Sequence, residues 1–505
     1  MILSPTRELA EQIAVEAKKL ARHTGIIIQT AVGGTGKRFM LQMMQNQGCH
    51  VLVATPGRLN DILSDPSSGV TTPKVNAFVL DEADRLLDEG FWPQVEEIKR
   101  SFPDPEQSDR QTLMFSATIP RQIVGVVENT LKPGFEFIKT VDDNEIPTHQ
   151  RVQQKIVSVN GLENMLPALY ELINREVAAR KNGAKPFKAI VYFNTTAEAD
   201  YANSAFFHLR RRDPNIPSVS AIHARLTQQG RTAAAMAFRR AQSAILLSSD
   251  VTARGMDFPD VTHVIQMALP RDGETYVHRL GRTARAGKEG EGWLFASPLE
   301  QNEIKRRLRG IPIKPDHSLR AATIDMTQET DVPESVAEIL TSVTSALQNV
   351  NKRDKSNYYK SLLGAYNWTS NKQHLVDVMN GLSRYSWGMV QPPPISSGIA
   401  RKLGLDRTVG MNIDDGAYAE EDRREGYSRE RSSSGFGDRR GGSGERRSSF
   451  GSSGGSSYGN RRSSFGSSGG GSFGSRDGFR GQDGYRSRND FQNRDRFSSR
   501  REGSY

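Results

Sequence analysis

Cysteine and long apolar runs are nearly absent from this chain, and each absence excludes a class of protein. Cys49 is the only cysteine among the 505 residues, which excludes an internal disulfide and any zinc site built from cysteines. No run of about 18 consecutive apolar residues occurs, the length that a membrane-spanning helix needs. What remains is a mixed sequence long enough for two or three folded units at about 150 residues each.

The glycine-rich loop that cradles phosphates in many nucleotide-binding proteins is also missing. Its pattern is G-x-x-x-x-G-K-[ST], and only Gly36 with Lys37 offers a start. Ala31 stands where the first glycine should be, and Arg38 stands where serine or threonine should follow the lysine. The pattern therefore fails at both ends.

Lysine is absent from the last 75 residues, yet this segment carries most of the net charge. It holds fifteen arginines and seven acidic residues, a net charge of +8 out of +10 for the whole chain. The string RRSSFGSSGG occurs twice in it, at 446–455 and 461–470. A Gly-, Ser- and Arg-rich segment cannot bury enough apolar surface to offset its ordering entropy, so we expect residues 414–505 to be disordered. Such a basic tail is typical of contact with an anionic polymer, with a solubilising linker as the alternative.

Short apolar runs alternate with helix-like segments in the rest of the chain, which predicts parallel sheets covered by helices. Polar signatures follow these runs, and ligands collect at the carboxyl ends of strands in such sheets. The expected strands lie at 51–54, 77–80, 113–115, 189–193, 245–247 and 264–267. Residues 141–150 lack periodicity and contain proline, so they read as a linker between two α/β domains. Helical spacing at 332–350 and 358–366 predicts a helical extension.

An acidic tetrapeptide, Asp81-Glu82-Ala83-Asp84, directly follows the expected strand 77–80. Asp81 can hold Mg²⁺, which favours carboxylate together with phosphate oxygens, and Glu82 can orient and deprotonate an attacking water. The alternative is a helix N-terminus whose acids only favour the helix dipole.

Arginines recur every third position in the segment from His278 to Arg285. Arg279, Arg282 and Arg285 would share one face if this segment were helical, and a forked guanidinium suits the charge on a transferred phosphoryl group. A basic solvated face is the alternative. The sequence SDVTARGMD at 249–257 comes shortly before, which favours the functional interpretation.

Together with these segments, other short motifs occur in the order typical of one family. They are Pro5-Thr6-Arg7-Glu8-Leu9-Ala10, Gly33-Gly34, Thr55-Pro56-Gly57-Arg58 and Ser116-Ala117-Thr118. Over residues 1–310 the chain resembles the DEAD-box RNA helicases. That resemblance implies two RecA-like domains that close on ATP, Mg²⁺ and single-stranded RNA. The implied boundaries are 1–140 for the first domain, 141–150 for the linker, 151–315 for the second domain, 316–413 for the extension and 414–505 for the tail.

The resemblance also implies residue roles. Asp81 and Glu82 would serve Mg²⁺ and water, Arg282 and Arg285 the γ-phosphate, and Asp257 with Gly255 the nucleotide. Ser116 and Thr118 would couple hydrolysis to RNA, and His278 would help join the domains. The RNA-facing residues would be Arg7, Gly34, Thr55, Arg58, Gln228, Arg231 and Arg254. These residue types bind phosphates and sugars without reading bases. On their own, Gly34 would more often be a turn glycine and Thr55 a helix N-cap, and we interpret His223 as a structural histidine.

The resemblance places the phosphate loop and an adenine-reading segment before Met1. We expect a sequence that begins at an internal methionine, because the other residues acting on ATP remain, and we expect little ATP turnover from this chain alone. Residues 318–412 and the tail resemble those of fungal mitochondrial DEAD-box proteins that act as general RNA chaperones in intron splicing. This second resemblance implies the mitochondrial matrix as location.

Three hypotheses stay open at this point. The first is an RNA-dependent ATPase, expected to be a monomer, that opens short RNA duplexes. The second is a non-catalytic RNA-binding protein, motivated by the missing phosphate loop. The third is a DNA-directed helicase, against which the tetrapeptide and the Arg/Gly tail both weigh.

Overall fold

The fold is described from a computed structural model of the chain. The structure describes residues 1–88, 90–103, 108–118, 124–140, 152–180, 186–285, 288–328 and 331–416. All of these belong to one compact unit, Met1–Gly435. Using the predicted boundaries, we call residues 1–140 the first lobe, residues 151–315 the second lobe and residues 316–413 the extension.

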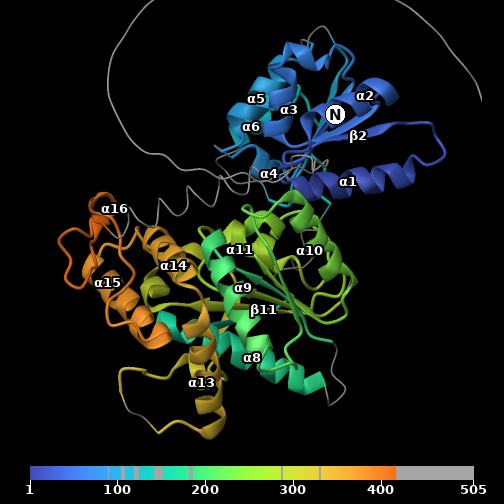
Figure 1. The fold of residues 1–505 in the computed structure, drawn as a ribbon. Coiled ribbons are helices and arrows are strands. Elements are labelled where there is room, and N and C mark those ends of the chain that lie inside the picture. The colour runs from blue at the N-terminus through green and yellow to red at the C-terminus, as the bar shows by residue number, and fades with distance from the viewer. Residues whose placement is uncertain are drawn as a thin grey trace, which may run out of the picture. The chain divides into compact units, whose positions relative to one another are not determined.

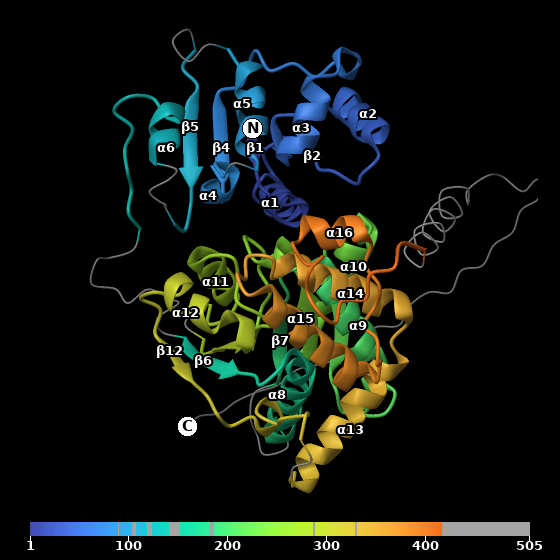
Figure 2. The same cartoon turned by 90° about the vertical axis from the view of Figure 1, so that its left-hand side faces the viewer.

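The first lobe contains a sheet of five parallel strands in the order β2-β3-β1-β4-β5 (Figures 1 and 2). The strands are β1 (Ile2–Leu3), β2 (Ile28–Ala31), β3 (Val51–Ala54), β4 (Ala77–Asp81) and β5 (Gln111–Phe115). The helices are α1 (Arg7–Leu20), α2 (Lys37–Gln47), α3 (Pro56–Leu63), α4 (Ala83–Leu86), α5 (Trp92–Arg100) and α6 (Val124–Thr130). Each strand enters a helix or loop at its carboxyl end, so the polar signatures gather at one edge of the sheet.

Burial is uneven across this first sheet. Leu3 on β1 and Leu80 on β4 are fully buried, as expected for the middle of a parallel sheet. The edge strand β5 is half-buried, and the Phe115 side chain is 56% exposed. The core of the first lobe therefore lies under its central strands.

The second lobe contains a sheet of seven parallel strands in the order β12-β6-β11-β10-β7-β9-β8. The strands are β6 (Gln153–Ser158), β7 (Lys188–Tyr192), β8 (Ser218–Ile222), β9 (Ala244–Ser248), β10 (His263–Gln266), β11 (Glu291–Ala296) and β12 (Ile313–Pro315). The helices are α8 (Met165–Arg180), α9 (Thr196–Arg210), α10 (Gln228–Arg240), α11 (Gly273–Leu280) and α12 (Gln301–Arg307). Every residue of β7, β9 and β10 is buried, because helices cover both faces of the sheet.

The extension is helical and packs on the second lobe (Figure 1). Its helices are α13 (Glu334–Asn349), α14 (Lys352–Ala365), α15 (Lys372–Gly381) and α16 (Ser397–Lys402), with a π-helical turn at Leu382–Ser386. Helices α13 and α14 contact α9, and their apolar side chains join those of the second lobe in one core. The extension and the second lobe therefore share a hydrophobic interior.

The predicted fold class is confirmed: two parallel α/β sheets are followed by a helical extension. The expected strands correspond to β3, β4, β5, β7, β9 and β10, with ends that shift by at most a few residues. The linker 141–150 and tail residues 417–505 lie outside the described residues. In the part of the chain that the structure describes, no helix combines the length and the apolar character that crossing a membrane demands.

Candidate functional site

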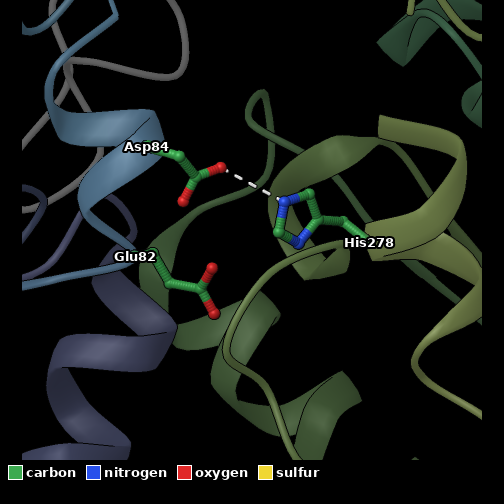
Figure 3. A group of neighbouring side chains, drawn as sticks. All are labelled: Glu82, Asp84 and His278. Atoms are coloured by element: carbon green, nitrogen blue, oxygen red, sulfur yellow. Dashed lines mark hydrogen bonds and ion pairs between the residues drawn. The ribbon is translucent and has the colours of Figure 1, made fainter. Parts of the chain in front are cut away.

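The acidic tetrapeptide lies where β4 ends at the edge of the first sheet. Asp81 is the last residue of β4, and α4 begins two residues later. Glu82, between them, adopts a left-handed conformation with φ of 52°. For a residue other than glycine this conformation costs roughly 1–2 kcal/mol. Figure 3 shows the Glu82 and Asp84 carboxylates on the side facing His278 of the second lobe. The strained turn thus presents the acids to the other lobe.

Asp84 is the centre of the contacts between the lobes. It is buried, and Ser116 Oγ lies 2.9 Å from its Oδ1. From the second lobe, His278 Nε2 lies 3.2 Å from Asp84 Oδ2, and Arg254 forms an ion pair with the same oxygen. Burial alone would raise the pKa of Asp84, but the hydrogen bond from His278 and the charge of Arg254 outweigh burial and hold it well below its ordinary value. Asp84 is therefore an ionised carboxylate that binds both lobes.

Asp81 and Glu82 have less positive charge around them than Asp84 has. Burial, followed by the nearby charge of Glu82, raises the pKa of Asp81. Glu82 Oε2 is buried and has no hydrogen-bond partner among the described residues. A divalent cation or a positioned water would relieve both conditions, so this edge of the sheet fits Mg²⁺.

The residues that lie close enough together to hold a metal ion differ from the residue predicted to hold it. The ligand atoms of Glu82, Asp84 and His278 all lie within 4.8 Å of one another, and Asp81 is not in this group. From the sequence, Asp81 was predicted to hold the metal ion. The assignment of Asp81 to Mg²⁺ stays a prediction.

Ser116 and Thr118 follow β5, beside Asp84. Ser116 Oγ lies 2.6 Å from the Thr118 carbonyl oxygen as well as near Asp84, so it connects the end of β5 to the start of α4. Thr118 Oγ1 is buried without a hydrogen-bond partner among the described residues.

The expectation that three arginines share one helical face is wrong. Helix α11 ends at Leu280, where the Gly281 N–H donates to the Val277 carbonyl, so Arg282 and Arg285 lie in the turns beyond it. Arg279, on the helix, points into the second lobe. It donates to Asp250 Oδ1 at 2.8 Å and to Asn194 Oδ1 at 3.1 Å. Arg279 thus holds α11 against the sheet.

Arg282 and Arg285 lie close to each other, next to Gly255 and Asp257, the residues predicted to contact the nucleotide. Arg282 is buried and donates to the carbonyls of His278 and Met256. Burial, together with the charge of Arg285, lowers the pKa of Arg282 to about 10. Arg285 NH1 donates to Asp257 Oδ1 at 2.8 Å. The structure therefore brings together the residues predicted for the γ-phosphate and the ribose.

Gly255 and Asp257 also meet the first lobe. Gly255 has φ of 67°, and a β-carbon there would collide with Leu9 of α1. The Asp257 N–H donates to Gln12 Oε1 at 3.1 Å. Glycine is required at position 255 both by its backbone conformation and by this close approach.

The first-lobe residues predicted to bind RNA lie at the glycines Gly33 and Gly34 and at the start of α3. The Arg7 guanidinium covers Gly33 and Gly34, and a β-carbon on either glycine would collide with it. Gly34 has φ of 80°, so it also has the backbone conformation of a turn glycine. Thr55 is the N-cap residue of α3 but makes no side-chain capping hydrogen bond.

Arg58 lies on α3 and reaches the glycine loop. Its NH1 donates to the Thr35 carbonyl oxygen at 3.1 Å. His223, which we interpreted as structural, is buried with Nε2 at 2.7 Å from Asp200 Oδ1, although the two lack hydrogen-bond geometry. This short contact places the buried ring beside the carboxylate of Asp200.

The second-lobe residues predicted to bind RNA contact acids of the first lobe. Gln228 donates to Glu8 and to Glu11, at 3.2 and 3.3 Å. Arg231 NH2 forms an ion pair with Glu8 Oε2 at 2.6 Å, and Arg254 pairs with Asp84. These side chains therefore bind carboxylates in this structure.

Sequence reasoning missed the acidic face of α1. Glu8, Glu11 and Gln12 all contact the second lobe. Their spacing of three and four residues places them on one helical face, and that pattern could have revealed the surface. Asp84 was quoted with its motif but given no role, although Arg254 and His278 of the second lobe both contact it.

Two family models match the chain. The model described as DEAD/DEAH box helicase matches residues 1–126, and the model described as Helicase conserved C-terminal domain matches residues 166–287. The DEAD-box ATP-dependent RNA helicase 26 of Oryza sativa subsp. japonica is 36% identical over 420 residues, which cover 81% of this chain and 72% of that protein. The chain belongs to the family of DEAD-box ATP-dependent RNA helicases.

Fungal members of this DEAD-box family are more similar in sequence. The mitochondrial ATP-dependent RNA helicase mss116 of Aspergillus fumigatus is 50% identical over 421 residues, covering 82% of this chain and 64% of the relative. The mitochondrial ATP-dependent RNA helicase cyt-19 of Neurospora crassa is 44% identical over 418 residues, covering 82% of this chain and 66% of the relative. This chain thus spans slightly less than two thirds of these relatives.

A solved structure of the DEAD-box protein Mss116p bound to single-stranded RNA and AMP-PNP has the same arrangement. It matches with a TM-score of 0.66 and 29% identity, over 82% of this chain and 81% of that chain. Another, of Mss116 bound to single-stranded RNA and UDP-BeF, matches with a TM-score of 0.65 and 28% identity over 82% of each chain. The predicted pair of RecA-like lobes is confirmed.

Proposed function

We propose that this protein hydrolyses ATP when RNA is bound and uses the energy to open short RNA duplexes locally. The observation that carries the proposal is Asp84, which is held at once by Ser116 of the first lobe and by Arg254 and His278 of the second. Such a site is complete only when both lobes are together. ATP and RNA would then bind with positive coupling, because both would favour the closed arrangement.

The acids at the end of β4 would carry the chemistry on the ATP side. Mg²⁺, when bound, would neutralise charge on the phosphate oxygens. Asp81 would hold this ion: burial and the charge of Glu82 raise the pKa of Asp81, and a bound cation would offset both effects. Glu82 would orient the attacking water and accept its proton, and its unpartnered buried oxygen supports that role.

The second lobe would supply the positive charge for the transferred phosphoryl group. Arg282 and Arg285 lie together, and forked guanidinium groups suit the spread charge of that transition state. Asp257 would contact the ribose, with Gly255 allowing the close approach of the lobes. His278 would join the lobes through Asp84.

RNA would lie across both lobes and be bound through its backbone. Arg7, Gly34, Thr55 and Arg58 would form the face of the first lobe. Gln228, Arg231 and Arg254 would form that of the second, after exchanging their contacts with first-lobe carboxylates for contacts with RNA. Amide, hydroxyl and guanidinium groups contact phosphate and sugar without reading bases, so binding should depend little on sequence.

The test is ATP hydrolysis with and without RNA by the chain extended at its N-terminus with a phosphate-binding loop, in the wild type and in Glu82→Gln. We expect RNA to stimulate hydrolysis and Glu82→Gln to reduce the stimulated rate by about 10²- to 10⁴-fold, the usual contribution of general-base catalysis. RNA binding should be unchanged. Glu128→Gln, an exposed acid on α6, is the control and should keep the wild-type rate.

Two outcomes would contradict this proposal. Hydrolysis that RNA does not stimulate would contradict the RNA-dependent ATPase, and hydrolysis that Glu82→Gln leaves intact would remove Glu82 from the catalytic role. RNA binding without any ATP turnover would favour the other hypothesis, a non-catalytic RNA-binding protein.

We also propose action on structured RNA in the mitochondrial matrix, including intron splicing. The support is the identity to fungal helicases that are named mitochondrial. A fluorescent fusion should locate to mitochondria, and loss of the gene should leave mitochondrial introns unspliced. Cytosolic fluorescence together with normal splicing would contradict this assignment.

A further inference from the structure

Helix α9 of the second lobe meets α14 of the extension through polar and aromatic contacts. The N-cap residue of α9, Thr195, accepts a hydrogen bond from Ser361 Oγ at 2.7 Å. The rings of Tyr201 and Tyr358 are stacked with centroids 4.1 Å apart. Trp387 Nε1 donates to Tyr201 Oη at 2.7 Å. The extension thus docks on the first two turns of α9.

A small cavity lies at this contact, between the second lobe and the extension. Its volume is about 20 Å³, and side chains of both parts line it, including Phe193, Tyr201, Tyr358 and Leu362. Glu198 is the single charged side chain among the lining residues. The carboxylate is thus surrounded by apolar and aromatic side chains.

Glu198 is buried with part of its hydrogen-bonding capacity unused. The residue is 3% exposed, and its Oε1 has no hydrogen-bond partner among the described residues. Burying an ionised carboxylate without full compensation is costly, and a group in this position becomes neutral instead. Burial raises the pKa of Glu198 to about 7, although hydrogen bonds from Thr195 and the Asn194 backbone oppose that rise.

The charged and titratable groups that face Glu198 come from three elements. Glu300, in the 3-10 turn Pro298–Glu300, raises the pKa of Glu198, while Arg279 on α11 lowers it. Tyr358 and Tyr366 of α14 face it too, and burial holds the pKa of both tyrosines well above their ordinary value, so both stay neutral.

Burial raises the pKa of both Glu198 and Glu300, but the two carboxylates differ in the hydrogen-bond donors around them. Glu300 is equally buried, but its carboxylate accepts hydrogen bonds from the Leu269 and Ser297 N–H groups, both at 2.8 Å. These donors stabilise the ionised form of Glu300. Glu198 Oε1 has no such donor.

We propose that the docking of the extension on α9 is sensitive to pH, with Glu198 neutral while α14 is in place and its ionisation loosening α14. The docked state holds a proton on Glu198 up to about pH 7, whereas an exposed glutamate releases it near its ordinary value of 4.5. Stability of the contact is therefore complete below pH 4.5 and falls as pH rises through about 7. Within that window each pH unit should change the docking equilibrium about tenfold.

Loosening of α14 would also affect the part of the second lobe that is predicted to contact the nucleotide. Asn194 immediately precedes the N-cap of α9, and its Oδ1 accepts a hydrogen bond from Arg279. Arg279 holds α11, which carries His278. The path from Ser361 of the extension thus runs through Thr195 and Asn194 to Arg279 on α11, the helix that contacts Asp84.

Hydrogen exchange of the α14 amides in the full chain tests the proposal. Protection factors correct for the intrinsic pH dependence of exchange, so a remaining slope reports docking. In the wild type we expect protection of α14 to fall about tenfold per pH unit between about pH 5 and about pH 7. Glu198→Gln, a neutral side chain of the same shape, should give protection that does not change with pH. Glu338→Gln, an exposed acid on α13, should keep the wild-type slope.

Wild-type protection that is flat with pH, or the same slope in Glu198→Gln, would overturn the proposal. An ionised Glu198 solvated by water in the cavity would give that flat profile. If Glu198→Gln does not fold, infrared spectra of the wild type decide instead. A carboxylic acid carbonyl band must then be present at about pH 6 and disappear above about pH 8.

Discussion

The two lobes share a parallel-sheet architecture but differ in how completely their sheets are covered. Phe295 on β11 of the second lobe is fully buried, whereas Phe115 on β5 of the first is 56% exposed. The second lobe has seven strands and adds the extension to its core, and the first has five strands with a half-buried edge. The second lobe is therefore a tightly packed scaffold, while the edge strand of the first lobe is only partly covered.

The buried polar side chains of the two lobes also differ in where their partners lie. In the second lobe the buried Arg279 is satisfied internally, by Asp250 and Asn194. In the first lobe Asp84 and Glu8 obtain their cationic partners from the second lobe. The contacts of Arg279 therefore lie within one lobe, whereas the pairs of Asp84 and Glu8 with Arg254 and Arg231 require both lobes. Variants of matched residues in the two lobes test this difference.

The largest effect is expected at Phe295. Phe295→Ala should lower the free energy of unfolding by about 3–5 kcal/mol, because it leaves a cavity in a sheet covered on both faces. Urea unfolding of the second lobe, followed by tryptophan fluorescence, measures this. Phe207→Ala, on the exposed side of α9, is the control and should cost less than about 1 kcal/mol. Equal costs at the two positions would show that the second lobe is not the tightly packed scaffold described above.

A smaller effect is expected at Asp84, where the lobes meet. Asp84→Asn removes the negative charge between Arg254 and His278 and leaves the buried guanidinium unpaired. Truncating one partner of a buried charge pair costs about 2–5 kcal/mol, which here opposes closure of the lobes. Energy transfer between labels on Cys49 and on a Gln242→Cys variant, both exposed positions, should report a larger separation.

Asp88 provides the matched control for this measurement. It also contacts the second lobe, through Arg271 at 3.5 Å, but both side chains are partly exposed. Exposed pairs contribute about 0–1 kcal/mol, so Asp88→Asn should leave the energy transfer close to wild type. A larger change in Asp88→Asn than in Asp84→Asn would mean that Asp84 does not hold the lobes together.

Much of the fold was predictable from local pattern. The strands that end at Ala54, Asp81 and Ser248 are apolar runs followed by polar signatures, and a sheet edge is the natural place for such signatures. The spacing of the arginines suggested a shared helical face, but helix α11 stops at Leu280, before Arg282 and Arg285. Periodicity alone does not reveal where a C-terminal turn begins.

The predicted site residues are brought together, but their partners were only partly predictable. Arg285 and Asp257 form an ion pair, which motif order alone did not show. The contacts of Gln228 and Arg231 with Glu8 depend on how one lobe meets the other, and no local pattern contains that information. The burial of Glu198 likewise depends on α14, more than 150 residues away along the chain.

The smallest effect is expected at the edge of the first sheet. Phe115→Ala should cost less than about 1 kcal/mol in urea unfolding, because more than half of the side chain already contacts water. Exposed apolar edge strands promote association, so the variant should also scatter less light at high concentration. A cost as large as that of Phe295→Ala would show that Phe115 is covered in solution. The two sheets would then be equally well packed, and the contrast between the lobes would rest on their charges alone.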